Sequence, residues 1–396
     1  MNKVQMKYNF LHILYWMNTL SIVGFVAVLL QSKGLSNTEI GIVTGASSMT
    51  TIFLSPILSA QCAKIKKLSL QQLLIVFLTI ECGSFLSIGF LPLSKAVLMI
   101  LYIGLYALNI STVPLVSTIA MNYIEEGKKI NFGLSRGLGS ISYAVSAVIA
   151  GQLVSHFAPS SLCLLCIGSA VICMLILIVL PPSYSKQKGQ NTEEGTNIVS
   201  IALNYRKLTG LLLGFGLAFA ASACLGTYLI NIISELGGNA SMLGIATFFM
   251  AASELPCMAA APKLMRRFGT KKLLCIAALF YIVRNITVCL APNLPILFLG
   301  LAFQGLSYGL FTPVITYYVA ENLEKKDQIM GQTMIGVMTS GVGAALGNTM
   351  GGMLQDTYGM QTMLFFVMFL TLGGAGIVNG LNILRASKKE IQLASR

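Results

Sequence analysis

The chain has 396 residues, of which 55% are hydrophobic and only 10% are charged. A soluble domain of this size needs more charge to cover its surface, so the composition predicts an all-α, multi-pass membrane protein. The formal net charge of +13 does not indicate nucleic acid as a partner, because the basic residues are confined to short stretches between apolar segments. No run of alternating polar and apolar residues favours a β-barrel.

Apolar segments of about 20 residues, the length that crosses a bilayer, recur along the whole chain. The first lacks a small-residue cleavage site, so we expect a retained helix rather than a signal peptide. In chain order the pattern predicts about twelve transmembrane helices, at residues 9–30, 39–61, 70–91, 95–121, 132–155, 160–181, 208–232, 241–262, 273–291, 294–319, 331–354 and 361–384.

The distribution of lysine and arginine predicts the orientation. The connections on one side hold most of the basic residues, among them Lys64, Lys66, Lys67, Lys263, Arg266, Arg267, Lys271 and Lys272. The connections on the other side hold only Lys33 and Lys95. Because basic residues mark the cytoplasmic side, we expect both termini to be cytoplasmic.

A polar stretch, PSYSKQKGQNTEEGTN at residues 182–197, has the composition of a flexible linker. It predicts an N-terminal six-helix bundle at 1–181, a cytoplasmic linker at 182–207 and a C-terminal bundle with a short tail at 208–396. The two halves contain similar stretches, SPILSAQCAKIKKLSLQQLL and LPCMAAAPKLMRRFGTKKLL, each with a proline, a short apolar run, a basic turn and the start of a new helix. Two pseudo-symmetric bundles of this kind are typical of alternating-access transporters.

Two charges lie inside apolar segments of the second half. Glu254 and Arg284 flank a short basic loop, RRFGTKK at residues 266–272. A charge at the bilayer centre costs about 2.5–3.5 kcal/mol unless it is paired or faces a wet cavity. We therefore expect Glu254 to bind substrate, carry a proton or pair with Arg284. The alternatives are a purely structural ion pair, and an Arg284 that binds an anionic substrate.

The first half carries Glu81 near the middle of its third apolar segment and Arg136 about one turn into its fifth. Arg136 is the one basic residue of this half that could pair with Glu81. Arg136 either faces a cavity, where a guanidinium suits an anionic or hydroxyl-rich ligand, or extends to the cytoplasmic surface. Glu81 is either functional or a neutral, hydrogen-bonded structural side chain.

Amides inside apolar segments are further candidates, because a buried amide needs partners and a binding cavity supplies them. They are Asn18, Asn109, Asn231, Asn285 and Gln304. Aromatic residues such as Tyr15, Trp16 and Tyr143 are compatible with cavity lining or with packing.

Small residues are predicted to pack helices. Gly343, Gly347 and Gly351 recur every four residues, a spacing that allows close helix approach; a sliding surface is the alternative. Cys163 and Cys166 have the spacing of a metal or redox pair, but we interpret them as packing residues. The chain has no phosphate-binding loop and no HExxH pattern, and its two histidines provide no catalytic set, so we expect no enzyme, no cofactor and no metal site.

Six motifs, in this order, resemble the major facilitator superfamily over nearly the whole chain. The closer resemblance is to the oligosaccharide/proton symporters of the lactose permease type and to phenylpropionate- and nucleoside-permease-like relatives. The motifs are KGLSNTEIGI (33–42), NFGLSRGLGS (131–140), SELP (253–256), KLMRRFGTKKLL (263–274), VRN (283–285) and GNTMGGMLQDTYG (347–359).

The resemblance implies roles for four residues. Arg136 matches a sugar-binding arginine, Glu254 a substrate-contacting glutamate and Arg284 an arginine of the proton-coupling network. Tyr143 stands where lactose permease has a tryptophan that stacks on the sugar ring. The sequence departs from the family pattern where a fourth-helix glutamate is replaced within VPLVSTIA, and Gln304 stands in place of a tenth-helix charged residue.

We therefore expect a secondary transporter in the bacterial cytoplasmic (inner) membrane that takes up a small polar solute, such as a sugar, oligosaccharide or nucleoside, with protons. Its partners would be the solute, the proton and the lipid bilayer, and we expect a monomer. An exporter of drugs or metabolites and an uncoupled facilitator are the alternatives. A membrane-embedded enzyme would need a catalytic set of residues, and a sensor would need a sizeable soluble domain, and we expect neither. The expected substrate-binding residues are Arg136, Tyr143, Asn109, Glu254 and Gln304. The expected proton-coupling residues are Glu254, Arg284 and Glu81.

Overall fold

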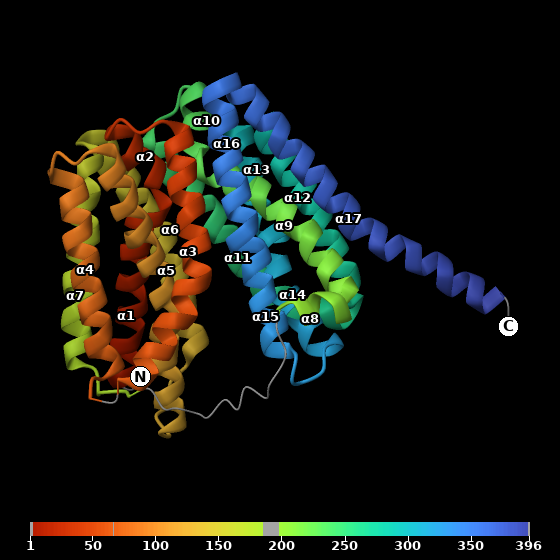
Figure 1. Cartoon of the computed structure of the whole chain (residues 1–396), viewed down its shortest axis with the longest axis horizontal. Helices are drawn as coiled ribbons and strands as arrows, with labels where there is room; N and C mark the ends of the chain where they lie inside the picture. Colours follow the sequence, from red (N-terminus) through yellow and green to blue (C-terminus); the bar gives the residue numbers. More distant parts are fainter. Residues whose placement is uncertain (1–2, 66, 185–197, 395–396) are drawn as a thin grey trace. The chain divides into compact units, whose positions relative to one another are not determined.

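The structure is a computed structural model that describes residues 3–65, 67–184 and 198–394 (Figure 1). Helix accounts for 88% of it, and no strand occurs within those ranges. Lys66 and residues 185–197 of the predicted linker lie outside the described residues.

The first half of the chain is a series of long helices with one break. Its elements are α1 (Lys3–Thr19), the π-helical turn η1 (Leu20–Gly24), α2 (Val26–Ser32), α3 (Asn37–Lys64), α4 (Leu70–Phe90), α5 (Lys95–Glu125), α6 (Phe132–His156), the 3-10 turn η2 (Pro159–Ser161) and α7 (Leu162–Val179).

The second half repeats this pattern. Its elements are α8 (Ile198–Asn204), α9 (Arg206–Thr227), α10 (Leu229–Glu235), α11 (Ala240–Phe268), α12 (Thr270–Cys289), α13 (Leu294–Ala302), the π-helical turn η3 (Gly305–Gly309), α14 (Leu310–Asn322), α15 (Gln328–Gly336), the π-helical turn η4 (Val337–Gly343), α16 (Ala344–Tyr358) and α17 (Met360–Ala394).

The predicted number of spans is confirmed. Within the described residues, 11 helical segments are long and apolar enough to cross a membrane, and the number is 12 if the bent pair Lys3–Gly24 and Val26–Ser32 forms one span. The two parts of that pair differ in direction by 50°. The bend follows η1, where a π-helical turn disturbs the regular hydrogen-bond ladder.

Local sequence explains several helix boundaries. Ser36 accepts a hydrogen bond from the Glu39 N–H while Glu39 accepts one from the Ser36 N–H, which completes a capping box at the start of α3. Ser69 and Gln72 form the same arrangement at the start of α4. These reciprocal bonds satisfy backbone donors that a helix N-terminus otherwise leaves without partners.

The prediction of a basic loop at residues 266–272 is wrong. Helix α11 continues to Phe268 and α12 begins at Thr270, so the turn is Gly269 alone, with φ of 77°. Glycine takes this left-handed conformation without steric cost. The arginines and lysines on either side have high helix propensity, so they extend the helices instead of forming a loop.

Two compact units group the chain. Unit 1 consists of Met1–Asn191 and Leu229–Phe248, and unit 2 of Thr192–Tyr228 and Phe249–Arg396. Tyr8, Tyr15 and Tyr123 lie in the buried core of unit 1. Phe215 and Phe311 lie in the core of unit 2, with ring centroids 4.2 Å apart.

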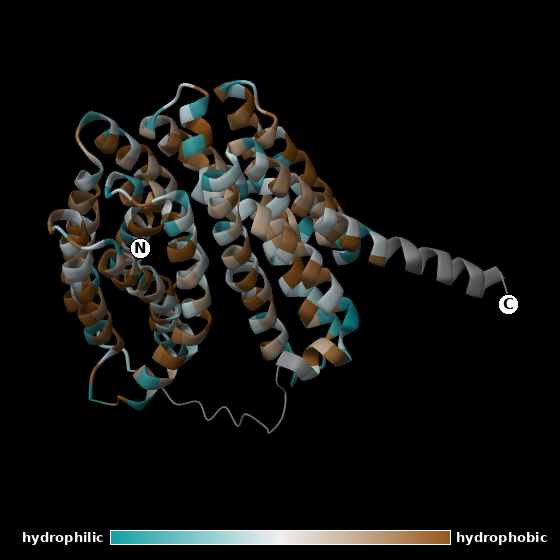
Figure 2. Ribbon diagram, turned by 45° about the horizontal axis from the view of Figure 1, so that its top comes forward, coloured by the Kyte–Doolittle hydropathy of each residue, from teal (hydrophilic) through white to brown (hydrophobic). Residues whose placement is uncertain are grey.

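Large apolar side chains also cover the outside of the helices. Ile100, Phe157 and Phe369 are 71%, 77% and 74% exposed. Figure 2 shows hydrophobic residues on many of the helices, and several of the most hydrophilic residues near helix ends and turns. Apolar side chains in such numbers on an outer surface are stable in lipid rather than in water.

The predicted packing role of the glycines near the end of the second half is confirmed. A Cβ atom on Gly343 would lie 2.7 Å from the carbonyl oxygen of Gly216, and one on Gly347 would lie 1.9 Å from that of Ala220. A Cβ on Gly351 would lie 2.2 Å from the Cys224 Sγ. Gly343 and Gly347 therefore let η4 and α16 contact the backbone of α9 directly, and Gly351 leaves room for the Cys224 side chain.

Replacing Gly347 with alanine is expected to destabilise unit 2. The added methyl group meets backbone, which cannot move aside as a side chain can, and overpacking of this kind costs about 1–3 kcal/mol or more. The control is Gly336→Ala, because no described atom of another element lies within 4 Å of the place that its added methyl group would take. Thermal unfolding in detergent should show a lower transition temperature for Gly347→Ala alone; equal temperatures for both variants would contradict the packing described.

Candidate functional site

Unit 1 brings a guanidinium and two aromatic rings together between α1 and α6. The Arg136 Cζ atom lies 4.2 Å from the centroid of the Trp16 ring. Tyr143 packs edge-on against the same ring, with centroids 6.3 Å apart. Arg136 is exposed and donates a hydrogen bond from Nη1 to the Ser140 hydroxyl at 2.8 Å. We call Trp16, Arg136 and Tyr143 the aromatic cluster.

Gly139 fixes the position of the Trp16 ring. A Cβ atom on Gly139 would lie 2.4 Å from the Trp16 Cδ1. The indole therefore occupies the space that any larger residue at this position would fill. One turn of α6 places Arg136 beside the same ring. The motif NFGLSRGLGS thus builds one side of the aromatic cluster.

A second polar group lies deep inside unit 1. Glu81 on α4 is fully buried, and its Oε2 accepts a hydrogen bond from the Asn109 Nδ2 on α5 at 3.0 Å. The same Nδ2 donates to the Asn18 Oδ1 at 3.0 Å, and Asn18 donates to the Cys166 carbonyl at 3.2 Å. Four helices, α1, α4, α5 and α7, therefore meet in one hydrogen-bonded group.

Arg136 is not part of this buried group. The one described hydrogen bond of the Glu81 carboxyl connects it to Asn109, whereas Arg136 lies against Trp16. The Asn109 amide is fully buried and donates to two partners. Its predicted contact with substrate stays a prediction.

Unit 2 places a carboxyl and an amide side by side. The Gln304 Nε2 donates to the Glu254 Oε1 at 3.1 Å, and both side chains are partly buried. Helix α11 approaches η3 closely, because a Cβ on Gly305 would lie 2.0 Å from the Ser253 carbonyl oxygen and one on Gly309 would lie 3.1 Å from the Glu254 Cα. Two glycines therefore bring the predicted residues Glu254 and Gln304 within hydrogen-bonding distance.

Arg284 is the largest buried cation that the structure describes, with 2% of its surface exposed. Its Nη1 donates to the Ser222 hydroxyl at 3.0 Å and to the Asn285 Oδ1 at 2.6 Å. Its Nη2 contacts the Met250 Sδ at 3.7 Å. Glu254 interacts with this guanidinium electrostatically, although neutral groups supply its described hydrogen bonds.

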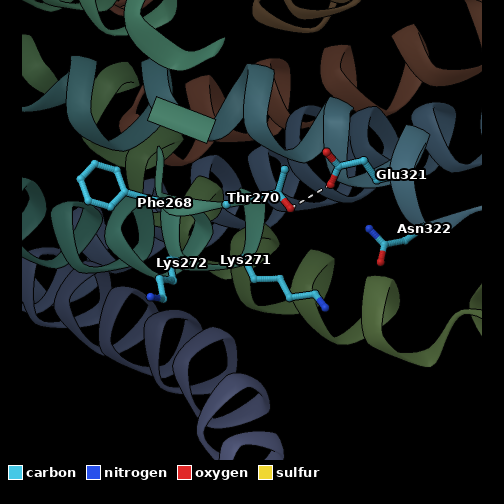
Figure 3. A pocket seen from close by; sticks show the side chains of 7 residues that line it. Phe268, Thr270, Lys271, Lys272, Glu321 and Asn322 are labelled. Carbon is cyan, nitrogen blue, oxygen red and sulfur yellow. Dashed lines mark hydrogen bonds between the residues drawn. The ribbon is translucent and has the colours of Figure 1, made fainter. Parts of the chain in front are cut away.

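A cavity of about 490 Å³ lies at the turn between α11 and α12 (Figure 3). Thr270 donates a hydrogen bond to the Glu321 carboxylate at 3.0 Å on one side of it. Lys271, Lys272 and Asn322 complete its polar lining. None of the predicted site residues lines this cavity.

Six of the nine cysteines are buried among the helices. All nine are free thiols, and Cys163 and Cys166 are buried between helices. Within residues 3–65, 67–184 and 198–394, no group of three His, Cys, Asp or Glu side chains could hold a metal ion.

Two residues outside the predicted site contact its members: Trp16 in the aromatic cluster, and Ser222 beside Arg284. Trp16 supplies the ring that Arg136 covers. The sequence alone does not distinguish Trp16 from the neighbouring Tyr15 as a residue of the site. Ser222 supplies a hydroxyl to Arg284 from α9. A serine within a run of small residues is an ordinary packing residue, so no sequence signal distinguished it.

The described helices and the charges buried among them are those of a multi-pass membrane protein. A match to the MFS_1-like family covers residues 5–367. The chain therefore belongs to the MFS_1-like family.

The chain is similar to characterised and uncharacterised bacterial transporters. It is 27% identical over 282 residues to a maltose permease of Geobacillus stearothermophilus, covering 71% of this chain and 70% of the permease. It is 24% identical over 381 residues to the uncharacterized transporter YwbF of Bacillus subtilis (strain 168), covering 95% and 92% of the two chains.

Two solved structures share the fold. The nucleoside transporter NupG superposes with a TM-score of 0.78 at 17% identity, covering 96% of this chain and 99% of NupG. A bacterial homologue of the human lysosomal transporter Spinster superposes with a TM-score of 0.63 at 14% identity, covering 96% and 94% of the two chains.

Proposed function

We propose that this transporter takes up a small polar solute, a sugar, oligosaccharide or nucleoside, together with protons. It would act in the bacterial cytoplasmic membrane as a monomer, with both termini in the cytoplasm. The maltose permease relative and the fold shared with a nucleoside transporter support these substrate classes, because both solutes carry hydroxyl-bearing rings.

The aromatic cluster is the observation that carries the proposal. A guanidinium 4.2 Å from an indole centroid combines hydrogen-bond donors with a flat apolar surface. Hydroxyl groups of a sugar or ribose can accept hydrogen bonds from the Arg136 guanidinium, and the ring can stack on Trp16 or Tyr143. Arg136 and Tyr143 would therefore bind the solute, with Trp16 as a further contact.

Glu254 is the proposed link between solute and proton. Its carboxyl lies 3.1 Å from the Gln304 amide nitrogen, while the Gln304 Oε1 is buried without a partner in the described structure. A protonated Glu254 can donate to such an oxygen, whereas an ionised one cannot. Arg284 would favour the ionised form of Glu254 by electrostatic attraction. Proton uptake and loss at Glu254 would then change the contacts that it offers to the solute.

The test measures external pH in a lightly buffered, de-energised suspension of cells that express the protein. Sugars, nucleosides and aromatic acids are added in turn. The expected result is alkalinisation with sugars or nucleosides, lost in Glu254→Gln and retained in Glu324→Gln, which changes an exposed carboxylate of unit 2.

The other outcomes of this experiment identify the alternatives. Uptake of the labelled solute is measured in parallel, so that solute entry and proton movement are compared in the same cells. Solute entry without alkalinisation would contradict proton coupling and support an uncoupled facilitator. Absence of uptake of every compound would contradict the proposed substrate classes.

A further inference from the structure

The buried Glu81–Asn109 pair contains two oxygen atoms without hydrogen-bond partners. Glu81 is 0% exposed and Asn109 is 0% exposed. One hydrogen bond joins them, from the Asn109 Nδ2 to the Glu81 Oε2. The remaining oxygens, Glu81 Oε1 and Asn109 Oδ1, have no donor within the described residues. An acceptor left unpaired in the interior costs about 1–3 kcal/mol, so this arrangement calls for a missing donor.

Among the residues that the structure describes, no cation faces Glu81 to stabilise its ionised form. The titratable side chains that face it are Tyr15 from α1, Cys82 from its own helix, and Cys166 and Cys173 from α7. All are neutral or acidic groups. An ionised carboxylate without a cation in such an interior is strongly disfavoured.

A single proton would resolve both observations. A neutral carboxylic acid and a primary amide can form two hydrogen bonds, one from the amide N–H to a carboxyl oxygen and one from the carboxyl O–H to the amide oxygen. The first bond is present at 3.0 Å. The second would join Glu81 Oε1 and Asn109 Oδ1, the two atoms that lack partners.

We propose that Glu81 and Asn109 form a second proton-binding site, in unit 1, that takes up and releases one proton in each transport cycle. Asn109 also holds Asn18 on α1 at 3.0 Å, just before η1 and the 50° bend. Loss of the proton leaves a negative charge on the Glu81 carboxylate, which is stable only in contact with water. Opening of α1 at this bend would let water reach the carboxylate. Release of the proton is thereby linked to a movement of α1.

This inference rests on the proposed proton coupling, and two measurements separate the two claims. The first is the number of protons carried per solute, obtained from the reversal potential in liposomes. Glu81→Gln is expected to halve this ratio, because one of two proton sites is lost. Glu126→Gln, which changes a partly exposed carboxylate of the same unit, should leave it unchanged. An unchanged ratio in Glu81→Gln would overturn the inference.

The second measurement depends neither on transport nor on the folding of a Glu81 variant. Infrared difference spectra of purified Glu254→Gln protein at increasing pH should contain the carbonyl band of a neutral carboxylic acid that disappears as the pH rises. Asn109→Ala should shift the frequency of this band, because the carboxyl group then loses its hydrogen bonds to the Asn109 amide. A wild-type ratio of zero together with this titration would refute proton coupling and the part of Glu81 in the transport cycle, and would leave only a buried group that binds a proton. The absence of a titrating band sensitive to Asn109 would refute the proton-binding site itself.

Discussion

Arg284→Ala is expected to abolish proton-coupled accumulation of the solute. The guanidinium donates to Ser222 and Asn285, and Asn285 in turn donates to the Thr371 hydroxyl at 2.8 Å. Removing it leaves the buried Asn285 oxygen without this donor, at a cost of about 1–3 kcal/mol, and removes the charge that acts on Glu254. We expect a loss of at least about tenfold in the transport rate, which corresponds to about 1.4 kcal/mol.

Lysine is not expected to rescue this loss, because one ammonium nitrogen cannot replace both the Nη1 bonds to Ser222 and Asn285 and the Nη2 contact with Met250. Arg206→Ala is the matched control, since Arg206 is exposed at the start of α9. Uptake of labelled solute is compared at equal amounts of folded protein. Accumulation at the wild-type level in Arg284→Ala would show that the buried guanidinium has no part in coupling.

Trp16→Ala is expected to weaken solute binding by roughly tenfold, or about 1.4 kcal/mol. The variant removes a stacking surface and the aromatic partner of Arg136, an interaction of about 0.5–2 kcal/mol. Arg136→Ala should weaken binding similarly by removing the donors. Because the two side chains contact each other, the double variant should lose less than the sum of the single losses.

Trp16→Phe separates binding from packing, since it keeps an aromatic ring against Gly139 and should retain most of the affinity. Phe90→Ala is the control, because Phe90 is an exposed aromatic of the same unit, 66% accessible. The half-saturating solute concentration is measured in initial-rate uptake. Equal values for Trp16→Ala and the wild type would exclude the aromatic cluster as the solute site.

The number of spans and the positions of the intramembrane charges could be predicted because they depend on runs of about 20 apolar residues. The turn at Gly269 could not, because the same basic residues are compatible with a loop and with helix ends. Prolines are also weak guides to helix boundaries in this chain, since Pro256 and Pro262 lie inside α11 without ending it.

The contacts of the predicted site residues depend on how each helix is rotated about its axis, and hydropathy alone does not determine that rotation. Glu254 meets Gln304 because Gly305 and Gly309 let two helices approach. The sequence offers Arg136 as the one basic residue of this half that could pair with Glu81, yet the hydrogen-bond partner of Glu81 is Asn109. Small residues on a facing helix decide such contacts, and one sequence does not show which helices face each other.

The most direct measurement uses purified protein in liposomes with an alkaline interior and the labelled solute selected in the cell experiment. The proposed function predicts accumulation above the external concentration, collapse of the accumulation when a protonophore is added, and no accumulation with Glu254→Gln. Equal final levels inside and outside, with and without the pH gradient, would contradict proton-coupled uptake.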